Sequence, residues 1–193
     1  RRGPLRGPSP ARRMLCPPLP GAPALTPLTT DRLRLRRLTL DDAPFILDLV
    51  NQPSWLENIG DKGVHDLDGA RDYLRNGPLA MYEKHGFGLY CIERADDGTA
   101  MGMCGLIKRD TLDDVDIGYA LLPQYWGQGY AREAAHAILQ HTARDFGLQR
   151  VVAITSPGNA SSARLLESLG FRFERMLSLS RDDEVKLFGW TAA

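Results

Sequence analysis

Two glycines, Gly127 and Gly129, lie between a predicted strand that ends at Pro123 and the start of a long predicted helix. Glycine lets backbone N–H groups turn toward a ligand with no Cβ in the way, and the first turn of a helix adds unpaired donors and the positive end of its dipole. This arrangement predicts an anion site, and a pyrophosphate fits it. A dinucleotide fingerprint would need a third glycine where the chain has Arg132, and nothing resembles a P-loop, so we set both of those motifs aside.

The loop and a second segment resemble one known family. The loop reads Gln124-Tyr-Trp-Gly127-Gln-Gly129, similar to the Gln/Arg-x-x-Gly-x-Gly/Ala pyrophosphate loop of the GNAT superfamily. About thirty residues on, the segment from Asn159-Ala-Ser-Ser162 to Gly170-Phe171 is similar to a helix of the RimJ/RimL-type ribosomal-protein acetyltransferases. Asp116-Ile-Gly-Tyr is close to the Glu-Ile-Gly-Tyr strand of that branch. The resemblance extends over roughly residues 31–190.

This resemblance implies an N-acetyltransferase that uses acetyl-CoA as co-substrate and transfers the acetyl group directly to an amine, with no covalent enzyme intermediate. It also implies the GNAT fold, an α/β architecture whose mostly antiparallel mixed sheet contains a splayed parallel pair and has helices on both faces. A bulge in the strand before the loop is expected to free a backbone N–H for the thioester oxygen. The residues implied to bind acetyl-CoA are Leu121, Leu122, Gln124, Gly127, Gln128, Gly129, Tyr130, Ala131, Asn159 and Ser162.

Two residues are candidates for acid–base catalysis. Asp116 stands where related sequences carry a Glu, so we expect it to act as the base, through water; a strand carboxylate that faces solvent is the alternative. Many relatives have a Tyr seven residues after the Asn, where this chain has Leu166. The resemblance to the RimL-like branch then implies Ser162 as the donor to the departing thiolate. Tyr130 is a second candidate for that role, and a structural helix serine is the alternative for Ser162.

Neighbouring residues have simpler interpretations. Asn159 caps its helix, and in the family the same side chain also meets the pantetheine arm. Tyr125 and Trp126 are expected to pack beside the loop. Arg132 and Arg164 are expected to be solvated helix residues, and contact with the CoA phosphates is the alternative.

Hydrophobic periodicity predicts the elements that position these residues. The expected strands cover residues 33–38, 87–93, 99–107, 115–122, 151–155, 171–179 and 184–190. The expected helices cover a stretch after residue 39, a stretch from 66 that ends at Asn76-Gly77-Pro78, and the ranges 129–146 and 160–169. Residues 55–63 are expected to form a loop. Antiparallel strands followed by strand–helix–strand–helix–strand predict a mixed sheet.

Composition indicates one domain, residues 29–193, after a Pro- and Arg-rich leader, residues 1–28, that we expect to be disordered. The chain begins with Arg1 and contains Met14, so a start-site artefact is expected rather than a functional tail; an organelle transit peptide is the alternative. Equal numbers of basic and acidic residues, 24 each, argue against nucleic-acid binding, and no apolar run suggests a membrane partner.

The three cysteines suggest neither a disulfide framework nor a metal site, and a cytoplasmic protein is the default expectation. Cys91 and Cys104 are equidistant from Asp97-Gly98, so a two-residue hairpin there would place them directly opposite each other as packing residues.

No motif in the sequence identifies the acceptor amine. A protein N-terminus is slightly preferred, and a small amine such as an antibiotic, polyamine or amino acid is the second possibility. A non-catalytic acyl-CoA-binding module is the third. Acceptor choice is expected to reside in residues 55–63, the first two helices and the C-terminal strands, and the protein to be a monomer or a homodimer.

Overall fold

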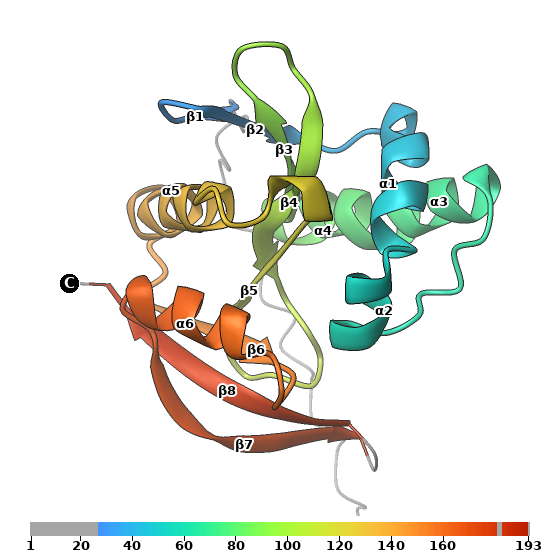
Figure 1. Cartoon of the computed structure of the whole chain (residues 1–193). Helices are drawn as coiled ribbons and strands as arrows, with labels where there is room; N and C mark the ends of the chain where they lie inside the picture. The colour runs from blue at the N-terminus through green and yellow to red at the C-terminus, as the bar shows by residue number, and fades with distance from the viewer. Residues whose placement is uncertain (1–26, 181–182, 193) are drawn as a thin grey trace, which may run out of the picture.

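The computed structural model describes residues 27–180 and 183–192 and contains one mixed sheet covered by helices on both faces (Figure 1). The strands are β1 (Leu28–Thr29), β2 (Leu33–Arg37), β3 (Leu89–Arg94), β4 (Ala100–Ile107), β5 (Asp116–Leu121), β6 (Arg150–Thr155), β7 (Arg172–Ser180) and β8 (Asp183–Thr191). The helices are α1 (Ala43–Val50), α2 (Pro53–Asn58), α3 (Leu67–Leu74), α4 (Ala80–His85), α5 (Tyr130–Asp145) and α6 (Ala160–Ser168).

The sheet order is β1-β2-β3-β4-β5-β6-β8-β7, and β5 with β6 is the one parallel pair among its described neighbours. This confirms the predicted mixed, mostly antiparallel sheet with a parallel pair. Residues 1–26 of the predicted leader lie outside the described residues. Strand β1 begins at Leu28, which is the last residue of the predicted leader, 1–28.

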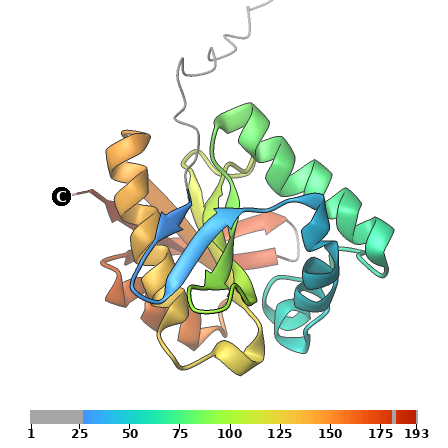
Figure 2. The same cartoon turned by 90° about the horizontal axis from the view of Figure 1, so that it is seen from above.

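The sheet separates two apolar clusters, and strand β5 contributes alternate side chains to each. Ile117 and Leu121 pack with α5 and α6, in the cluster that also contains Ile138 and Leu166. Leu122, just beyond the end of β5, packs with α1 and α3 on the other face. Figure 2 shows the same division, with α5 on one side of the strands and α1 to α4 on the other.

The helical face between β2 and β3 differs from the prediction in two places. The predicted loop 55–63 begins as α2, because Pro53 at the first helical position has the fixed φ that a helix start needs. The predicted break at Asn76-Gly77-Pro78 is also wrong: a π-helical turn, Arg75–Leu79, connects α3 directly to α4. The wider turn accommodates Pro78, which lacks an N–H and would clash with the carbonyl of a regular α-helical turn.

The expected Cys91–Cys104 pairing is wrong by one residue. Cys104 lies opposite Tyr90, and Cys91 opposite Met103. Residues 95–99 join the strands instead of a two-residue turn, and the register shifts at Ile92/Glu93, so the two thiols lie in the clusters on opposite faces of the sheet.

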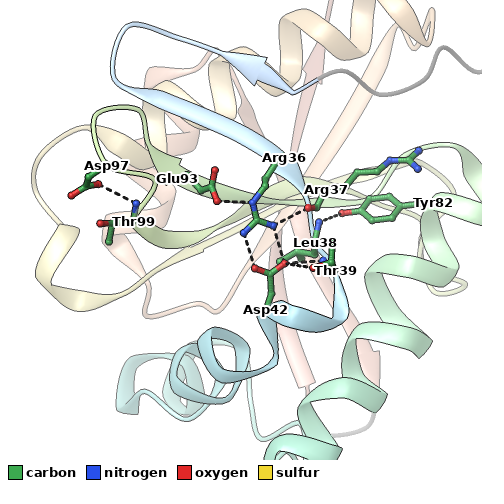
Figure 3. A network of polar contacts seen from close by, with 9 residues as sticks. All are labelled: Arg36, Arg37, Leu38, Thr39, Asp42, Tyr82, Glu93, Asp97 and Thr99. Carbon is green, nitrogen blue, oxygen red and sulfur yellow. Dashed lines mark hydrogen bonds and ion pairs between the residues drawn. The ribbon is translucent and has the colours of Figure 1, made fainter.

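A network of ion pairs around Arg36 attaches the α1 side of the molecule to the sheet (Figure 3). The Arg36 guanidinium on β2 contacts Glu93 of β3 at 2.5 Å and Asp42, just before α1, at 2.7 Å. Asp42 also accepts a 2.7 Å hydrogen bond from the backbone N–H of Thr39. Burial acts to raise the pKa of Asp42, but the hydrogen bonds from Arg36 and Thr39 lower it below the ordinary value of 3.8. The carboxylate is therefore charged at neutral pH, and it caps the 3₁₀ turn Leu40–Asp42 that leads into α1.

Candidate functional site

The loop after β5 requires left-handed backbone at both predicted glycines. Gly127 has φ +71° and Gly129 has φ +83°, a region that L-residues rarely adopt. A Cβ added to Gly127 would meet no protein atom within 4 Å, so no crowding within the protein explains this glycine. Tyr130 then begins α5, whose first-turn N–H groups have no partners within the helix. The backbone conformation expected of both glycines is present, and the anion site itself stays a prediction.

Arg32 and Glu133 hold this loop in place, and sequence reasoning missed both residues. The Arg32 guanidinium donates to Glu133 at 2.7 Å and to the carbonyl of Gln128 at 3.0 Å, and it lies 4.6 Å from the ring centre of Tyr130. Thr30 donates to the same carboxylate at 2.6 Å. Glu133 would otherwise put negative charge beside an anion site, and Arg32 neutralises it. The sequence does contain a signal for this pair. Glu133 lies in the first turn of α5, and a carboxylate there needs a neighbouring cation if an anion is to bind beside it.

Strands β5 and β6 pair at a single position and then separate. Asp116 lies opposite Val152, the backbone N–H of Val152 donates to the Val115 carbonyl at 2.9 Å, and no further pair follows along the two described strands. The gap therefore opens between the rest of β5 and the rest of β6, and the glycine loop lies at the far end of β5.

The expected bulge in β5 is absent from the described ladder, and only one of the two expected residues offers its N–H. The β4–β5 register is continuous from Gly102–Leu121 to Ile107–Asp116, and the N–H of Leu122 donates to the Met101 carbonyl at 2.9 Å. Because successive backbone groups of a strand point to opposite edges, the polar groups of Leu121 point away from β4 and toward the gap. Its carbonyl accepts a 2.8 Å hydrogen bond from the indole of Trp126, which is half exposed rather than packed.

A serine and a tyrosine meet at the α6 side of the gap. The Asn159 side chain caps α6 by accepting the Ser162 N–H at 3.0 Å, and the Ser162 hydroxyl lies 2.8 Å from the hydroxyl of Tyr119 on β5. Burial raises the pKa of Tyr119 to about 12, so the phenol stays protonated at neutral pH. Leu166, at the position of the Tyr found in many relatives, is fully buried in the core.

Tyr119 ends the Asp116-Ile-Gly-Tyr motif, and the sequence predicts no role for it. Strand alternation could have found it, because a residue two before Leu121 on the same strand must share its face.

Asp116 is buried, which excludes the solvent-facing alternative. Its side chain is 1% exposed, and both of its oxygens lie 3.1–3.2 Å from Nε of Arg109, in the β4–β5 connection. Burial raises the pKa of Asp116 above its ordinary 3.8, and the Arg109 charge opposes that rise without cancelling it. A carboxylate with a raised pKa is a stronger base than a solvated one.

The two catalytic candidates lie on opposite faces of the sheet. Asp116 is an odd number of residues from Tyr119 along β5, so its side chain points to the α1–α3 face while Tyr119 points to α6 and its Ser162. Asp116 lies at the paired end of β5 and β6, and the gap opens beyond it along β5. Among the remaining candidates, Arg132 donates to Ser168 at 3.3 Å and so links α5 to α6.

Two further features bear on ligands. No group of His, Cys, Asp and Glu side chains in residues 27–180 and 183–192 could hold a metal ion. Across the same part of the chain, every helix is too short or too polar to cross a membrane.

Comparison with known proteins gives consistent matches. The family model described as "Acetyltransferase (GNAT) domain" matches residues 32–172. The uncharacterized N-acetyltransferase YoaA of Bacillus subtilis is 28% identical over 151 residues, which is 78% of this chain and 85% of YoaA. The crystal structure of the acetyltransferase from Agrobacterium tumefaciens superimposes with a TM-score of 0.76 at 26% identity, covering 88% of this chain and 96% of that one. RimL, a ribosomal L7/L12 alpha-N-protein acetyltransferase solved in complex with coenzyme A, shares the fold with a TM-score of 0.75 at 18% identity, covering 86% and 98%.

Proposed function

Because the chain belongs to the GNAT acetyltransferase family and is an N-acetyltransferase, we propose that it transfers the acetyl group of acetyl-CoA directly to a primary amine, with a protein N-terminus preferred over a lysine side chain. The observation that carries this proposal is the separation of β5 from β6 beyond Asp116, with a left-handed glycine loop at the end of the gap. A gap with free backbone donors on one edge suits the extended pantetheine arm, and the loop suits the pyrophosphate.

In this proposal, different predicted cofactor residues bind different parts of acetyl-CoA. Gly127, Gln128, Gly129 and the first residues of α5 would donate backbone N–H groups to the pyrophosphate. The backbone N–H of Leu121 would stabilise the thioester oxygen as negative charge develops on it. The Asn159 side-chain oxygen is committed to capping α6, so its amide NH₂ is the part left for the pantetheine arm.

The chemistry then proceeds across the sheet. Asp116, through a water molecule, takes a proton from the amine, whose nitrogen lone pair forms the new bond to the thioester carbon. The C–S bond breaks, and the departing thiolate takes a proton from the Ser162 hydroxyl. Tyr119 positions that hydroxyl and can pass a proton to Ser162. Solvent then takes the proton held on Asp116 and returns one to Tyr119, so the net products are the amide and the CoA thiol.

An α-amine is the easier acceptor for this base. At pH 7.4 an α-amino group with a pKa of about 7.8 is roughly 30% neutral, whereas a lysine with a pKa of about 10.4 is only about 0.1% neutral. Asp116 is paired with a guanidinium, which weakens it relative to an unpaired buried carboxylate. Such a base suits an amine that is already partly deprotonated.

The test is CoA thiol release from acetyl-CoA against peptides with free Ala, Ser and Thr N-termini, an N-blocked lysine peptide, spermidine, amino acids and an aminoglycoside. Turnover of a free peptide N-terminus but not of its blocked form supports the proposal. Turnover of one small amine alone would show that the acceptor is a small molecule and that the protein acts in metabolism or antibiotic resistance. Micromolar acetyl-CoA binding with no turnover on any acceptor would refute the enzymatic proposal.

A further inference from the structure

The Asp116 carboxylate meets its cation through one shared N–H. Both carboxylate oxygens lie 3.1–3.2 Å from Nε of Arg109. The Asp116 side chain is 1% exposed, whereas the Arg109 side chain is 38% exposed. The carboxylate is therefore enclosed by the protein, while part of its arginine partner stays in contact with solvent. A carboxylate has about four acceptor sites, so a single shared donor leaves others open to a water molecule.

The β4–β5 connection fixes the backbone that carries Arg109. The Lys108 ammonium donates to the carbonyl of Asp113 at 2.7 Å and also to that of Leu112. The backbone N–H of Leu112 in turn donates to the Arg109 carbonyl at 3.3 Å. Leu112 is buried in a small apolar cluster with Val152 of β6. The connection is therefore bonded to itself and anchored to β6, which limits where the guanidinium can lie.

Burial and charge act on Asp116 in opposite directions. The residues beside it on the neighbouring strands, Ile107 of β4 and Val152 of β6, are apolar. Burial raises the pKa of Asp116 above its ordinary 3.8, while the charge and hydrogen bond of Arg109 lower it, with a smaller effect of Lys108 in the same direction. A buried carboxylate that loses its cation takes up a proton instead of staying charged. The contact with Arg109 therefore favours the ionised form, which is the form that a base needs.

Two groups on the helical face also sense the charge of Arg109. Burial raises the pKa of Tyr73 of α3 to about 12 against the effect of that charge, so the phenol is neutral. Burial and the same charge lower the pKa of Lys62 in the α2–α3 connection, and the Asp183 carboxylate of β8 opposes them. In the part of the chain that the structure describes, however, Arg109 alone has a nitrogen within ion-pair distance of Asp116. Substitution of this residue therefore isolates its effect on the carboxylate.

Resting on the proposed function, we propose that Arg109 is a positioning residue for acetyl transfer, which holds the enclosed Asp116 ionised and oriented so that it accepts the proton of the amine through water at neutral pH. Arg109 acts only through Asp116 in this role. The contact lowers base strength, because a carboxylate stabilised by a cation binds a proton less tightly, and it raises the fraction of Asp116 that is ionised. A salt bridge with a purely structural role would leave the pH dependence of the reaction unchanged.

Three variants separate the charge of Arg109 from its hydrogen bond. The amide nitrogen of glutamine stands as many bonds from Cα as Nε of arginine does, so Arg109→Gln keeps an N–H at the contacting position and removes the charge. Arg109→Lys keeps the charge slightly further along the side chain. Arg94→Gln is the matched control, because Arg94 on β3 is also 38% exposed and its Nε donates at 3.0 Å to Asp97, a carboxylate that is itself exposed.

The first measurement is the pKa of Asp116 in the protein without acetyl-CoA. Carbon-13 NMR of protein labelled at its aspartate carboxyl groups follows the titration, and Asp116→Asn assigns the signal. We expect Arg109→Gln to raise this pKa by about 1–3 pH units, the effect of losing an opposite charge at contact distance. Arg109→Lys and Arg94→Gln should leave it near the wild-type value.

The second measurement is kcat/KM for a peptide with a free Ala N-terminus, from about pH 5 to about pH 9, divided by the fraction of neutral amine at each pH. In Arg109→Gln the acid limb of this profile should move up by the same amount as the Asp116 pKa. Near the alkaline end the rate should equal or exceed that of the wild type, because a base with a higher pKa is stronger once it is deprotonated. The Kd for acetyl-CoA should not change.

Three results would overturn the inference. The first is an Asp116 pKa that Arg109→Gln leaves unchanged, the second is a rate lowered by the same factor at every pH, and the third is a shift that Arg94→Gln reproduces. In each case acetyl transfer itself continues and the proposed function stands. A wild-type protein that binds acetyl-CoA but acetylates no acceptor of the panel refutes the proposed function, and the inference falls with it.

Discussion

Replacing Gly127 with alanine separates the strain of the glycine loop from its role in holding an anion. Gly127 has φ +71°, and a Cβ built on it would meet no atom within 4 Å. Gly98, in the β3–β4 connection, has φ +72° and the same open surroundings. Alanine at either position costs about 1–2 kcal/mol of backbone strain. Both variants should therefore lose the same stability, about 2–8 °C in melting temperature.

The two variants should differ in acetyl-CoA binding. A Cβ at Gly127 occupies the open side of the loop, where backbone N–H groups would approach the pyrophosphate. Losing one charge-assisted hydrogen bond costs about 1.5–3 kcal/mol, which weakens the Kd for acetyl-CoA roughly 10- to 150-fold. Isothermal titration calorimetry on both variants, after scanning calorimetry has verified equal stability, measures this difference directly.

The reasoning has two ways to fail. If Gly98→Ala weakens acetyl-CoA binding as much as Gly127→Ala does, the loss reflects general destabilisation. If Gly127→Ala binds acetyl-CoA with wild-type affinity, the pyrophosphate does not lie against this loop, and the gap between β5 and β6 must be assigned to another ligand.

Three further changes test other parts of the site. Asp116→Asn should lower kcat about 10²-fold or less with acetyl-CoA affinity retained; in the wild type, kcat/KM should fall as pH drops through a pKa above 3.8, because the base must be deprotonated. Tyr119→Phe should lower kcat about 2- to 12-fold without changing KM for acetyl-CoA, the worth of one neutral hydrogen bond to Ser162; a change in KM alone would argue for a packing role. Asp42→Ala should cost roughly 2–4 kcal/mol of unfolding free energy, because it leaves Arg36 without its 2.7 Å partner. Since the Asp42 pKa is lowered by folding, that stabilisation is present above pH 3.8 and lost as pH falls through the folded-state pKa, which urea denaturation across pH can follow.

Local chemistry made much of the glycine loop and of the start of α6 predictable. The left-handed backbone at Gly127 and Gly129 follows from a pair of glycines between a strand and a helix. The N-cap of α6 follows from Asn159 at the helix start. Each feature depends only on a few adjacent residues. The strands were predictable for the same reason, because hydrophobic alternation is a property of each short segment. The order of strands and helices along the chain then predicted a mixed sheet.

The errors came from interactions between distant residues or from small backbone adjustments. The register shift at Ile92/Glu93 adds one residue to a strand and carries no composition signal. The π-helical turn around Pro78 keeps a helix continuous where proline normally ends one. Arg32 and Glu133, 101 positions apart, meet only once the fold has formed.

The alternation of side chains along β5 determines which face of the sheet each candidate residue occupies. Asp116 and Tyr119 are separated by an odd number of residues, so β5 carries a carboxylate to the α1–α3 face and a phenol to the α6 face. In the proposed mechanism the amine therefore loses its proton to one group, and the leaving thiolate receives its proton from another.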